Sequence, residues 1–545
     1  MIRIHSSAMG APYRAVNEGV LAYAPDSPER GALERELEAQ TTSVLDIPLV
    51  IGSKAEVTDS RSVVTPPFDH RHILARMSNA TREHAARAID AATAARREWS
   101  RWSLQERSEI FLKAADLLAG PWRQRLNAAT MLGQAKTVQQ AEIDAACELA
   151  DFLRFNVQFA QEIAGKQPIS GLGTRNQTDY RPLEGFVYAV TPFNFTAIGG
   201  NLATAPALMG NVVIWKPAAS AVLSNYMFMQ LLEEAGLPPG VINFLPGDPE
   251  ELTPTLLGSR EFAGLHFTGS TAVFDKLWLK TAQNVANYRN YPRLVGETGG
   301  KDFVLAHPSA NADALVIALL RGAFEYQGQK CSAASRAYIP GSLWPKVREK
   351  LVDLTTGLRM GDVRDFTNFM SAVIDRKAYD RNSRYLEMAR TDAGCNVLAG
   401  GYASSETGYF VSPTIVQVED AGHVLMREEI FGPVLAVYVY DDVRWSEVLQ
   451  LIDETSPYAL TGAVFAQDRR ALIDASDALR SAAGNFYLND KPTGAVVGQQ
   501  PFGGARRSGT NDKAGSPLNL LRFVSPRTIK ETYVPMTDHR YPHMG

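Results

Sequence analysis

Short apolar segments alternate with helix-like segments from Gly185 onward, and this alternation restricts the fold more than any other feature of the sequence. Residues 218–235 have helical periodicity, and Gly236 followed by Pro238 is typical of a helix end. Strands that alternate with helices predict a parallel sheet with helices packed on its faces. The strands expected in the first part of this region are residues 186–190, 212–215, 241–244 and 265–267.

A second alternating region begins near Glu297 and predicts a second α/β domain. A chain of 545 residues is too long for a single hydrophobic core, which agrees with such a division. Helices are expected over residues 314–324 and 342–357. The expected strands are residues 303–306, 337–339, 434–440, 464–466 and 486–489.

The N-terminal part differs from both regions. Residues 1–80 are punctuated by proline, which indicates an arm that wraps around a larger body, and helices are expected over residues 81–99, 103–118 and 139–164. Residues 165–185 are rich in Gly, Pro, Thr, Asn and Gln, which favours a loop or a protruding hairpin. The interpretation therefore divides the chain into residues 1–164, 165–185, 186–296, 297–515 and 516–545.

Net charge and cysteine content narrow the class of protein. The formal net charge of −4 argues against a large nucleic-acid interface, which needs clustered basic residues. No apolar run reaches about eighteen residues, so no membrane span is expected. Three scattered cysteines and the lack of a secretory signal favour a reducing compartment. We expect a cytoplasmic protein, or a mitochondrial matrix protein if the source is eukaryotic.

Cys331 is the first candidate for a reactive residue. It ends the stretch Tyr326-Gln-Gly-Gln-Lys-Cys331, a glycine-bearing break between an apolar helix and a short strand. Lys330 and nearby backbone N–H groups would favour the thiolate, the form that attacks an electrophilic carbon. The alternative is a buried cysteine that acts as a small apolar side chain.

Polar residues follow several expected strands, at the edge of a parallel sheet where ligands bind. Asn194 offers an amide donor for an oxyanion, and Glu297 is a carboxylate among glycines that suits a general base. Lys216 suits a ribose hydroxyl or phosphate, and Gly269 with Ser270 can approach a pyrophosphate. The dinucleotide fingerprint G-x-G-x-x-G is absent, so these residues alone leave nucleotide binding open.

Glu148 shares one face of the expected 139–164 helix with Phe152, Phe155 and Phe159. The periodicity by itself favours a solvated acidic edge beside a core stripe. The alternative is a half-buried carboxylate near a pocket that accepts a cationic group.

Six short motifs follow one another along the chain: Phe193-Asn194-Phe195, Trp215-Lys216-Pro217, Phe267-Thr-Gly-Ser270, Glu297-Thr-Gly-Gly300, Gly328-Gln-Lys-Cys331 and Glu429-Ile-Phe-Gly-Pro433. In this order they resemble the aldehyde dehydrogenase superfamily over nearly the whole chain. Three longer stretches, which begin at Phe193, Gln327 and Gly498, are similar to those of the Δ1-pyrroline-5-carboxylate dehydrogenase family.

The resemblance implies a fold, a reaction and an assembly. The fold would be α/β, with a Rossmann-like NAD-binding domain (1–164 and 186–296), an α/β catalytic domain (297–515) and a small β oligomerisation flap (165–185 with 516–545). The reaction would be oxidation of L-glutamate γ-semialdehyde, formed from Δ1-pyrroline-5-carboxylate, to L-glutamate in proline catabolism, with NAD as cofactor. The assembly would be a homo-oligomer, at least a dimer.

The same resemblance implies a role for each motif residue. Cys331 would form a thiohemiacetal and then a thioester, Asn194 would hold the oxyanion, and Glu297 would activate water. The implied NAD-binding residues are Thr191, Pro192, Phe193, Lys216, Gly269, Ser270, Glu429 and Phe431. The implied substrate-binding residues are Glu148 at the ammonium; Ser332, Gly494 and Ala495 at the carboxylate, with Lys330 near; and Phe195 and Phe502 on the aliphatic stem. No metal is implied.

Two positions depart from the family pattern. Ala219 stands where many members carry a glutamate that binds the ribose 2′-hydroxyl, so the usual bias against NADP is weakened. Ala495 stands where a serine is common, so one hydroxyl contact to the substrate would be missing.

Four other functions stay open on the sequence: a general aldehyde dehydrogenase, an acyl-CoA-forming member, a non-catalytic relative and a thiol esterase without a redox role. Glu297 argues against the acyl-CoA-forming reading, since that reaction needs no base for thioester hydrolysis. The intact set of Cys331, Asn194 and Glu297 argues against a non-catalytic relative.

Overall fold

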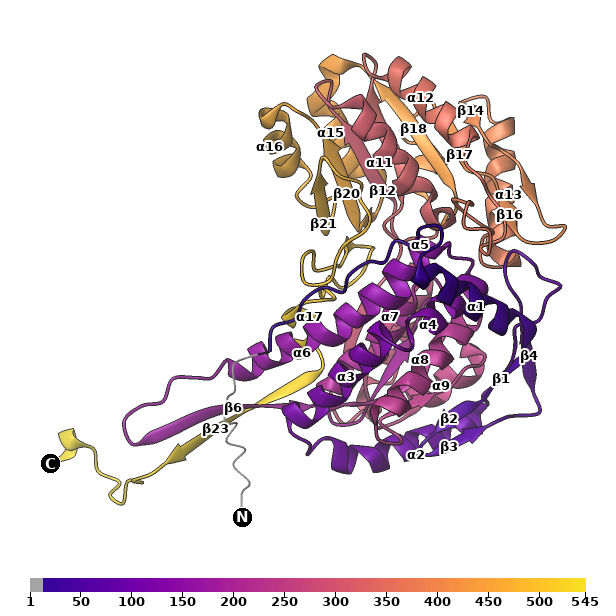
Figure 1. The fold of residues 1–545 in the computed structure, drawn as a ribbon. Coiled ribbons are helices and arrows are strands. Elements are labelled where there is room, and N and C mark those ends of the chain that lie inside the picture. The colour runs from indigo at the N-terminus through magenta and orange to yellow at the C-terminus, as the bar shows by residue number, and fades with distance from the viewer. Residues whose placement is uncertain (1–12) are drawn as a thin grey trace.

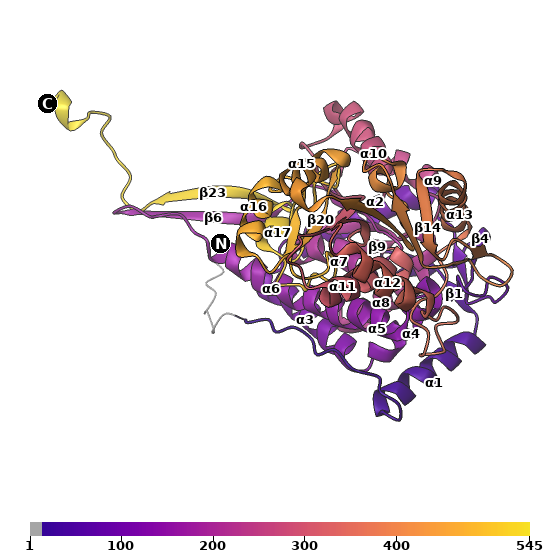
Figure 2. The ribbon, with the colours of Figure 1, turned by 90° about the horizontal axis from the view of Figure 1, so that it is seen from above.

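The computed structural model describes residues 13–545, which form two α/β lobes and a projecting two-stranded ribbon (Figure 1). The first lobe contains the N-terminal part of the chain, and the second contains most of the C-terminal half. In the view turned by 90°, the ribbon extends away from both lobes to one side (Figure 2).

A seven-stranded sheet forms the centre of the first lobe, in the order β11-β10-β7-β8-β9-β2-β3. Strands β7 to β11 are parallel to one another, and β2 and β3 add an antiparallel edge. The four expected strands are confirmed, and β11 is an addition, because its short sequence begins and ends with a charged residue. The strands are β2 Leu49–Ile51, β3 Lys54–Glu56, β7 Phe186–Val190, β8 Val212–Lys216, β9 Ile242–Phe244, β10 Phe262–Thr268 and β11 Arg293–Glu297.

Helices surround this sheet, and their starts follow local capping signals. Ser103 accepts a hydrogen bond from the Glu106 amide at 3.2 Å, and Glu106 accepts one from the Ser103 amide at 2.6 Å, so the capping box fixes the start of α3. Gly236 ends α8 in a left-handed conformation, as its sequence predicts. The helices are α2 Arg82–Trp99, α3 Leu104–Ala119, α4 Arg123–Gln134, α7 Thr196–Leu208, α8 Val222–Ala235, α9 Pro249–Gly258 and α10 Thr271–Gln283.

The long helix expected over residues 139–164 is present but contains a π-helical turn. It consists of α5 Val138–Ala141, the π-helical η1 Glu142–Glu148 and α6 Leu149–Gly165. A π-helical turn changes the angle between successive side chains and is frequent at functional sites. The direction of Glu148, the last residue of η1, therefore does not follow from an α-helical period.

The second lobe is built on another seven-stranded sheet, in the order β14-β17-β18-β13-β12-β20-β21. All neighbouring strands are parallel except β14, which pairs with β17 in the antiparallel direction. The expected strands are confirmed within a few residues at their ends, and β14 and β17 are additions. The strands are β12 Asp302–Ala306, β13 Ala334–Pro340, β14 Cys395–Ala399, β17 Thr414–Val418, β18 Val434–Tyr440, β20 Thr461–Phe465 and β21 Asn485–Leu488.

Two buried clusters cover the two faces of the second sheet, one centred on residues such as Phe303 and the other on residues such as Val304. Adjacent residues of one strand point to opposite faces, so both faces of the sheet are buried. The helices of this lobe are α11 Ala312–Phe324, α12 Trp344–Thr356, α13 Arg376–Thr391, α14 Val424–Arg427, α15 Trp445–Thr455 and α16 Arg469–Ala478.

Smaller elements complete the lobes. A three-stranded sheet, ordered β1-β5-β4, lies next to α1 Pro28–Thr42 in the N-terminal region. Its strands are β1 Leu45–Ile47, β4 Arg61–Val64 and β5 Ala75–Ser78. Two further antiparallel pairs are β15 Ala403–Ser404 with β16 Phe410–Val411, and β19 Tyr458–Ala459 with β22 Ala505–Arg506.

The ribbon corrects the prediction of a hairpin within residues 165–185. That segment supplies only one strand, β6 Thr174–Pro182, and its partner is β23 Val524–Thr532 near the C-terminus. The pairing is antiparallel and continuous from Val524 opposite Pro182 to Thr532 opposite Thr174. A sequence window around β6 cannot reveal a partner so far along the chain.

The residues just before β23 return to the first lobe. Leu520 and Phe523, in and after α17 Pro517–Leu521, are fully buried in the core of that lobe. The Asn211 side chain donates to the Phe523 carbonyl at 2.8 Å and accepts from the Leu183 amide at 2.9 Å. Within residues 13–545, no helix has both the length and the apolar character needed to cross a membrane.

Candidate active site

A cavity of about 310 Å³ is lined by residues of both lobes. This cavity brings together nine residues that the sequence predicted for catalysis or for substrate binding. They are Glu148, Phe195, Glu297, Lys330, Cys331, Ser332, Gly494, Ala495 and Phe502. Asn194 is not part of the lining but donates a hydrogen bond to the carbonyl of Gln329, two residues before Cys331, and the predicted NAD-binding residues also lie outside the lining.

Cys331 is presented by a backbone segment in an unusual conformation. After α11, the short 3₁₀ turn Glu325–Gly328 contains Tyr326 and Gln327 with φ angles of 53° and 56°. Non-glycine residues in this region cost free energy and cluster at functional sites. The Gln327 side chain holds the turn by donating to the carbonyls of Ala135 at 3.1 Å and Ala372 at 2.7 Å.

The environment of Cys331 disfavours the thiolate before substrate and cofactor bind. Burial, and then the carboxylates of Glu297, Asp302 and Glu429, raise the pKa of the Cys331 thiol well above its ordinary value. Formation of the thiolate therefore needs a proton acceptor, and Glu297 is the carboxylate with the largest effect on the thiol.

The structure pairs Lys330 with a carboxylate, which the sequence did not indicate. The Lys330 ammonium binds the Glu325 carboxylate at 3.0 Å, and both side chains are buried. Lys330 also lowers the pKa of Glu148, and its effect on the Cys331 thiol stays a prediction.

Glu297 ends strand β11 and has the properties of a general base. Its Oε1 accepts from the Gly504 amide at 2.9 Å. Burial raises its pKa to about 8, and the Gly504 amide and the Lys513 ammonium limit the rise. A carboxyl group with a pKa near the working pH transfers protons efficiently. Lys513, which the sequence analysis missed, is held by the carbonyl oxygens of Gly484 and Gly503.

Asn194 lies between the first lobe and the Cys331 segment. It is only 3% exposed, and its Nδ2 donates to the Gln329 carbonyl at 3.1 Å. Among the described residues this is the one hydrogen bond of the Asn194 amide, so its second N–H is available to a ligand. Amide donors of this kind suit a developing oxyanion.

The predicted NAD-binding residues of the first lobe gather at one edge of its sheet. Strands β7, β8 and β10 are neighbours and parallel, so Thr191, Lys216 and Ser270 follow strands at the same edge. Ser270 begins α10, whose N-terminal N–H groups suit a pyrophosphate. Burial lowers the pKa of Lys216 to about 8, and within residues 13–545 its ammonium has no hydrogen-bond partner.

The second lobe contributes Glu429 and Phe431 from the facing side. Glu429 Oε1 accepts from the Gly300 amide at 2.8 Å, and a Cβ at Gly299 would lie 2.5 Å from Oε2, so a side chain at residue 299 would displace this carboxylate. The Phe431 ring packs edge-on against Phe193 of the first lobe, with ring centroids 5.7 Å apart. The Lys216 ammonium (unpaired among the described residues), the N-terminus of α10 and the hydrogen-bonded Glu429 carboxylate together suit the phosphates and ribose hydroxyls of a dinucleotide.

Glu148 is a wall residue of the cavity and not a solvated edge, which corrects the interpretation that periodicity favoured. Burial and the nearby Asp144 raise its pKa to about 8, and Lys136 and Lys330 oppose this rise. Phe195 lies beside it in the lining and carries the Lys136 ammonium over its ring at 3.8 Å. The site therefore contains a carboxylate that becomes charged when a cation approaches.

Groups that can bind an anion occur in residues 491–495 and at Ser332. Ser332 Oγ lies 2.8 Å from Thr493 Oγ1. Within the described part of the chain, the amide N–H groups of Gly494 and Ala495 donate to no protein acceptor. Lys491 Nζ donates to the Thr493 carbonyl at 3.1 Å and also lines the cavity. Free amides, hydroxyls and an ammonium suit a carboxylate, and sequence reasoning missed Lys491 and Thr493.

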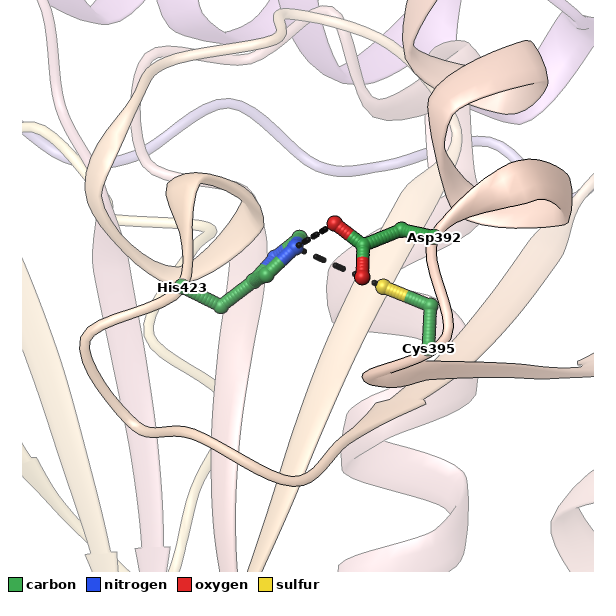
Figure 3. A group of neighbouring side chains, drawn as sticks. All are labelled: Asp392, Cys395 and His423. Atoms are coloured by element: carbon green, nitrogen blue, oxygen red, sulfur yellow. Dashed lines mark hydrogen bonds and ion pairs between the residues drawn. The ribbon is translucent and has the colours of Figure 1, made fainter.

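A separate cluster of Asp392, Cys395 and His423 lies at the edge of the second lobe (Figure 3). His423 Nε2 lies 3.3 Å from Asp392 Oδ2 and 3.5 Å from Cys395 Sγ. His423 Nδ1 accepts from the Leu425 amide at 3.2 Å, so the ring proton lies on Nε2, the nitrogen that a metal would have to bind. The three side chains satisfy one another as a hydrogen-bonded cluster.

The fold and the site together define a dehydrogenase that uses a cysteine nucleophile, and comparison with known proteins agrees. Residues 55–529 match the model of the aldehyde dehydrogenase family, so the chain belongs to that family. Within the family it groups with proteins named delta-1-pyrroline-5-carboxylate dehydrogenase. The mouse mitochondrial protein of this name is 51% identical over 99% of this chain and 96% of its own length. The human mitochondrial protein is 50% identical over 99% of this chain and 95% of its own length.

Solved structures show the same relationship. The delta-pyrroline-5-carboxylate dehydrogenase of Mycobacterium tuberculosis, in a crystal structure bound with NAD, is 54% identical, with a TM-score of 0.96, and the match covers 99% of this chain and 100% of that one. A 1-pyrroline-5-carboxylate dehydrogenase from Thermus, also with bound NAD, is 30% identical, with a TM-score of 0.89, over 96% of this chain and 100% of that one.

Proposed function

We propose that this chain oxidises L-glutamate γ-semialdehyde, the open form of Δ1-pyrroline-5-carboxylate, to L-glutamate with NAD. The observation that carries the proposal is one cavity that holds a nucleophile and base, Cys331 and Glu297, together with partners for both charges of an amino acid. The names of the mouse and human relatives agree with this substrate.

The first part of the reaction forms a bond to sulfur. Glu297 accepts the thiol proton of Cys331, and the thiolate attacks the aldehyde carbon, so that a C–S bond forms and the carbonyl oxygen becomes an oxyanion. The free N–H of Asn194 and the backbone N–H of Cys331 stabilise this oxyanion. Both donors are fixed before the reaction, so they need no reorganisation when the charge develops.

The second part releases the acid. NAD, when bound, supplies the acceptor for the hydride that leaves the substrate carbon, and the carbonyl re-forms as a thioester on Cys331. Glu297, after losing its first proton to solvent, accepts a proton from water as the water attacks the thioester. The C–S bond then breaks, the leaving sulfur takes the proton of the new carboxylic acid, and the products are the Cys331 thiol and the new carboxylate of glutamate.

The residues at the strand edge support binding of a dinucleotide. Lys216 suits the adenosine ribose, Gly269 with Ser270 suits the pyrophosphate, and Glu429 suits the nicotinamide ribose, with Phe431 packed beside it. NAD is the proposed cofactor, and the NAD-bound relatives support it.

Wild-type enzyme is expected to reduce NAD with glutamate γ-semialdehyde far more efficiently than with propanal, which lacks both charged groups. The comparison of kcat/KM for the two aldehydes tests the proposed function. Equal values would mean that the charged ends of the substrate contribute nothing, and would favour a general aldehyde dehydrogenase.

Glu148→Gln is expected to raise KM for the semialdehyde by about 10- to 100-fold, because the substrate ammonium then lies in a buried site without its counter-charge. The rate with propanal is expected to stay within about twofold. Steady-state kinetics with both aldehydes measure the effect. A matched control is Glu233→Gln, at a carboxylate on α8 outside the cavity lining; an equal rise of KM in this variant would show that the effect is not local to the site.

We further propose that the ribbon is an oligomerisation element and that the protein is at least a dimer. Large apolar side chains on and around the ribbon are exposed, among them Ile169 at 92%, Val534 at 80% and Met536 at 82%. Exposed apolar groups of this kind mark protein–protein contacts. The proposed compartment stays the cytoplasm, or the mitochondrial matrix if the source is eukaryotic; the names of the mouse and human relatives include the word mitochondrial.

A chain that ends at Val524 is expected to be a monomer, whereas the full chain elutes as a dimer or larger. The truncation removes β23 beyond its first residue and the exposed tail, but keeps Leu520 and Phe523 in the first-lobe core. Light scattering coupled to gel filtration measures the mass. A truncated chain that keeps the same number of subunits per particle as the full chain would exclude this role of the ribbon.

A further inference from the structure

Residues 13–24, here called the N-terminal strap, run along α6 and reach the substrate cavity (Figure 1). Side chains of η1 and α6 accept hydrogen bonds from the strap backbone. The pairs are Tyr13 with Gln161 at 3.1 Å, Ala15 with Gln158 at 2.9 Å, Glu18 with Asp151 at 2.7 Å and Leu21 with Glu142 at 2.8 Å. The strap precedes residues 55–529, which match the family model, so the general family pattern does not describe it.

Asn17 is the point where the strap joins the rest of the cavity wall. Its Nδ2 donates to Asp151 Oδ2 at 2.7 Å and to the Val497 carbonyl at 2.8 Å. Its Oδ1 accepts from Gln499 Nε2 at 3.0 Å. One amide group therefore ties α6 to the turn at residues 497–500.

That turn follows directly on Gly494 and Ala495, which line the cavity and whose N–H groups have no protein acceptor among the described residues. The Val496 amide donates to Gln500 Oε1 at 2.9 Å, and the amides of Gln499 and Gln500 both donate to the Val496 carbonyl at 3.0 Å. Gly498 has a φ of +82°, and a Cβ there would lie 2.3 Å from the Phe155 ring of α6. The turn therefore packs against α6 at Gly498 and is hydrogen-bonded to Asn17 at Val497 and Gln499.

We propose that Asn17 is a positioning residue for the substrate carboxylate: it fixes the turn at 497–500, and through it the free amides of Gly494 and Ala495. This inference rests on the proposed function, which assigns these amides to the carboxylate. The carboxylate lies at the end of the substrate remote from the reacting carbon. Loss of the tie therefore weakens binding of substrate and transition state alike, which raises KM and leaves kcat unchanged.

Asn17→Ala is compared with Val16→Ala, a matched control at the neighbouring residue, whose side chain is 73% exposed. Asn17→Ala removes three hydrogen bonds at one site, and KM for the semialdehyde is expected to rise about five- to tenfold. The kcat for the semialdehyde and the kcat/KM for propanal are expected to stay within about twofold of wild type. Val16→Ala is expected to match wild type in all three quantities.

Hydrogen exchange gives a second readout that does not depend on the substrate. The amides of Val496, Gln499 and Gln500 are expected to exchange faster in Asn17→Ala than in Val16→Ala, with α6 unchanged. An unchanged KM together with unchanged exchange in this turn overturns the inference, and so does an equal loss with propanal. Failure of the proposed function looks different, because wild-type enzyme would then not prefer the semialdehyde, whatever residue occupies position 17.

Discussion

Cys331→Ala is expected to lower the rate of NADH formation by at least about 10⁴-fold, because the sulfur that forms the proposed covalent intermediate is lost. The substitution removes the sulfur that carries the thiohemiacetal and the thioester. It leaves the strand edge with Lys216 and Ser270 intact, so NAD binding is expected to persist within about twofold. Stopped-flow absorbance of NADH measures the first effect, and calorimetric titration with NAD measures the second.

Cys395 supplies a matched control for this prediction. It lies in the cluster with Asp392 and His423, outside the cavity lining, whereas Cys147 lines the cavity and is not a clean control. Cys395→Ala is expected to retain wild-type activity. Dehydrogenase activity above about 1% in Cys331→Ala would show that the reaction does not pass through this sulfur.

Glu297→Gln is expected to slow both halves of the reaction, because Glu297 accepts the thiol proton of Cys331 in the first half and a proton from water in the second. The amide can accept neither proton, so steady-state turnover is expected to fall by about 10²- to 10⁴-fold. The NADH formed in the first turnover reports the first half, and the acyl-enzyme on Cys331 reports the second. Rapid mixing followed by mass spectrometry of the trapped acyl-enzyme measures both.

The pH dependence of wild-type turnover follows from the same residue. Burial raises the pKa of Glu297 to about 8, so the carboxyl is protonated and inactive below this value and becomes a base above it. Turnover is therefore expected to rise with pH through about 8, and the rise is expected to disappear in Glu297→Gln. Hydroxylamine, which attacks a thioester without a base, is the control and is expected to speed release of the acyl group in the variant without speeding formation of the first NADH. A variant that hydrolyses the thioester at the wild-type rate would assign the base to another group.

Local patterns predicted the elements that local forces specify. The buried parallel strands are short apolar runs, so their sequences located β7, β8 and β18 to within a residue or so. The capping box of Ser103 and Glu106 located α3 in the same way. Local sequence patterns did not predict two other features. The strand β6 pairs with the distant β23, and η1 is a π-helical turn within a longer helix, and neither feature has a signal in a short stretch of sequence.

In the candidate site, too, local motifs predicted some residues, and others could be recognised only from the structure. The motifs around Cys331, Asn194 and Glu297 identified residues that the fold brings together from three separate stretches of chain. The sequence could not show which acid neutralises Lys330, because Glu325 reaches it only through the turn at Tyr326 and Gln327. Lys491 and Lys513 were missed because nothing in the sequence distinguishes them from the other lysines. Only the structure shows that their ammonium groups bind backbone carbonyl oxygens.

The burial of Leu520 and Phe523 in the first lobe has a consequence for biosynthesis. The core of the lobe that is translated first lacks these side chains until residues 520–523 have been synthesised, and β6 lacks its partner strand until β23 follows. Domains normally fold as units, the N-terminal one first, while translation continues. In this chain the first lobe is expected to complete its core only after the whole second lobe has been translated.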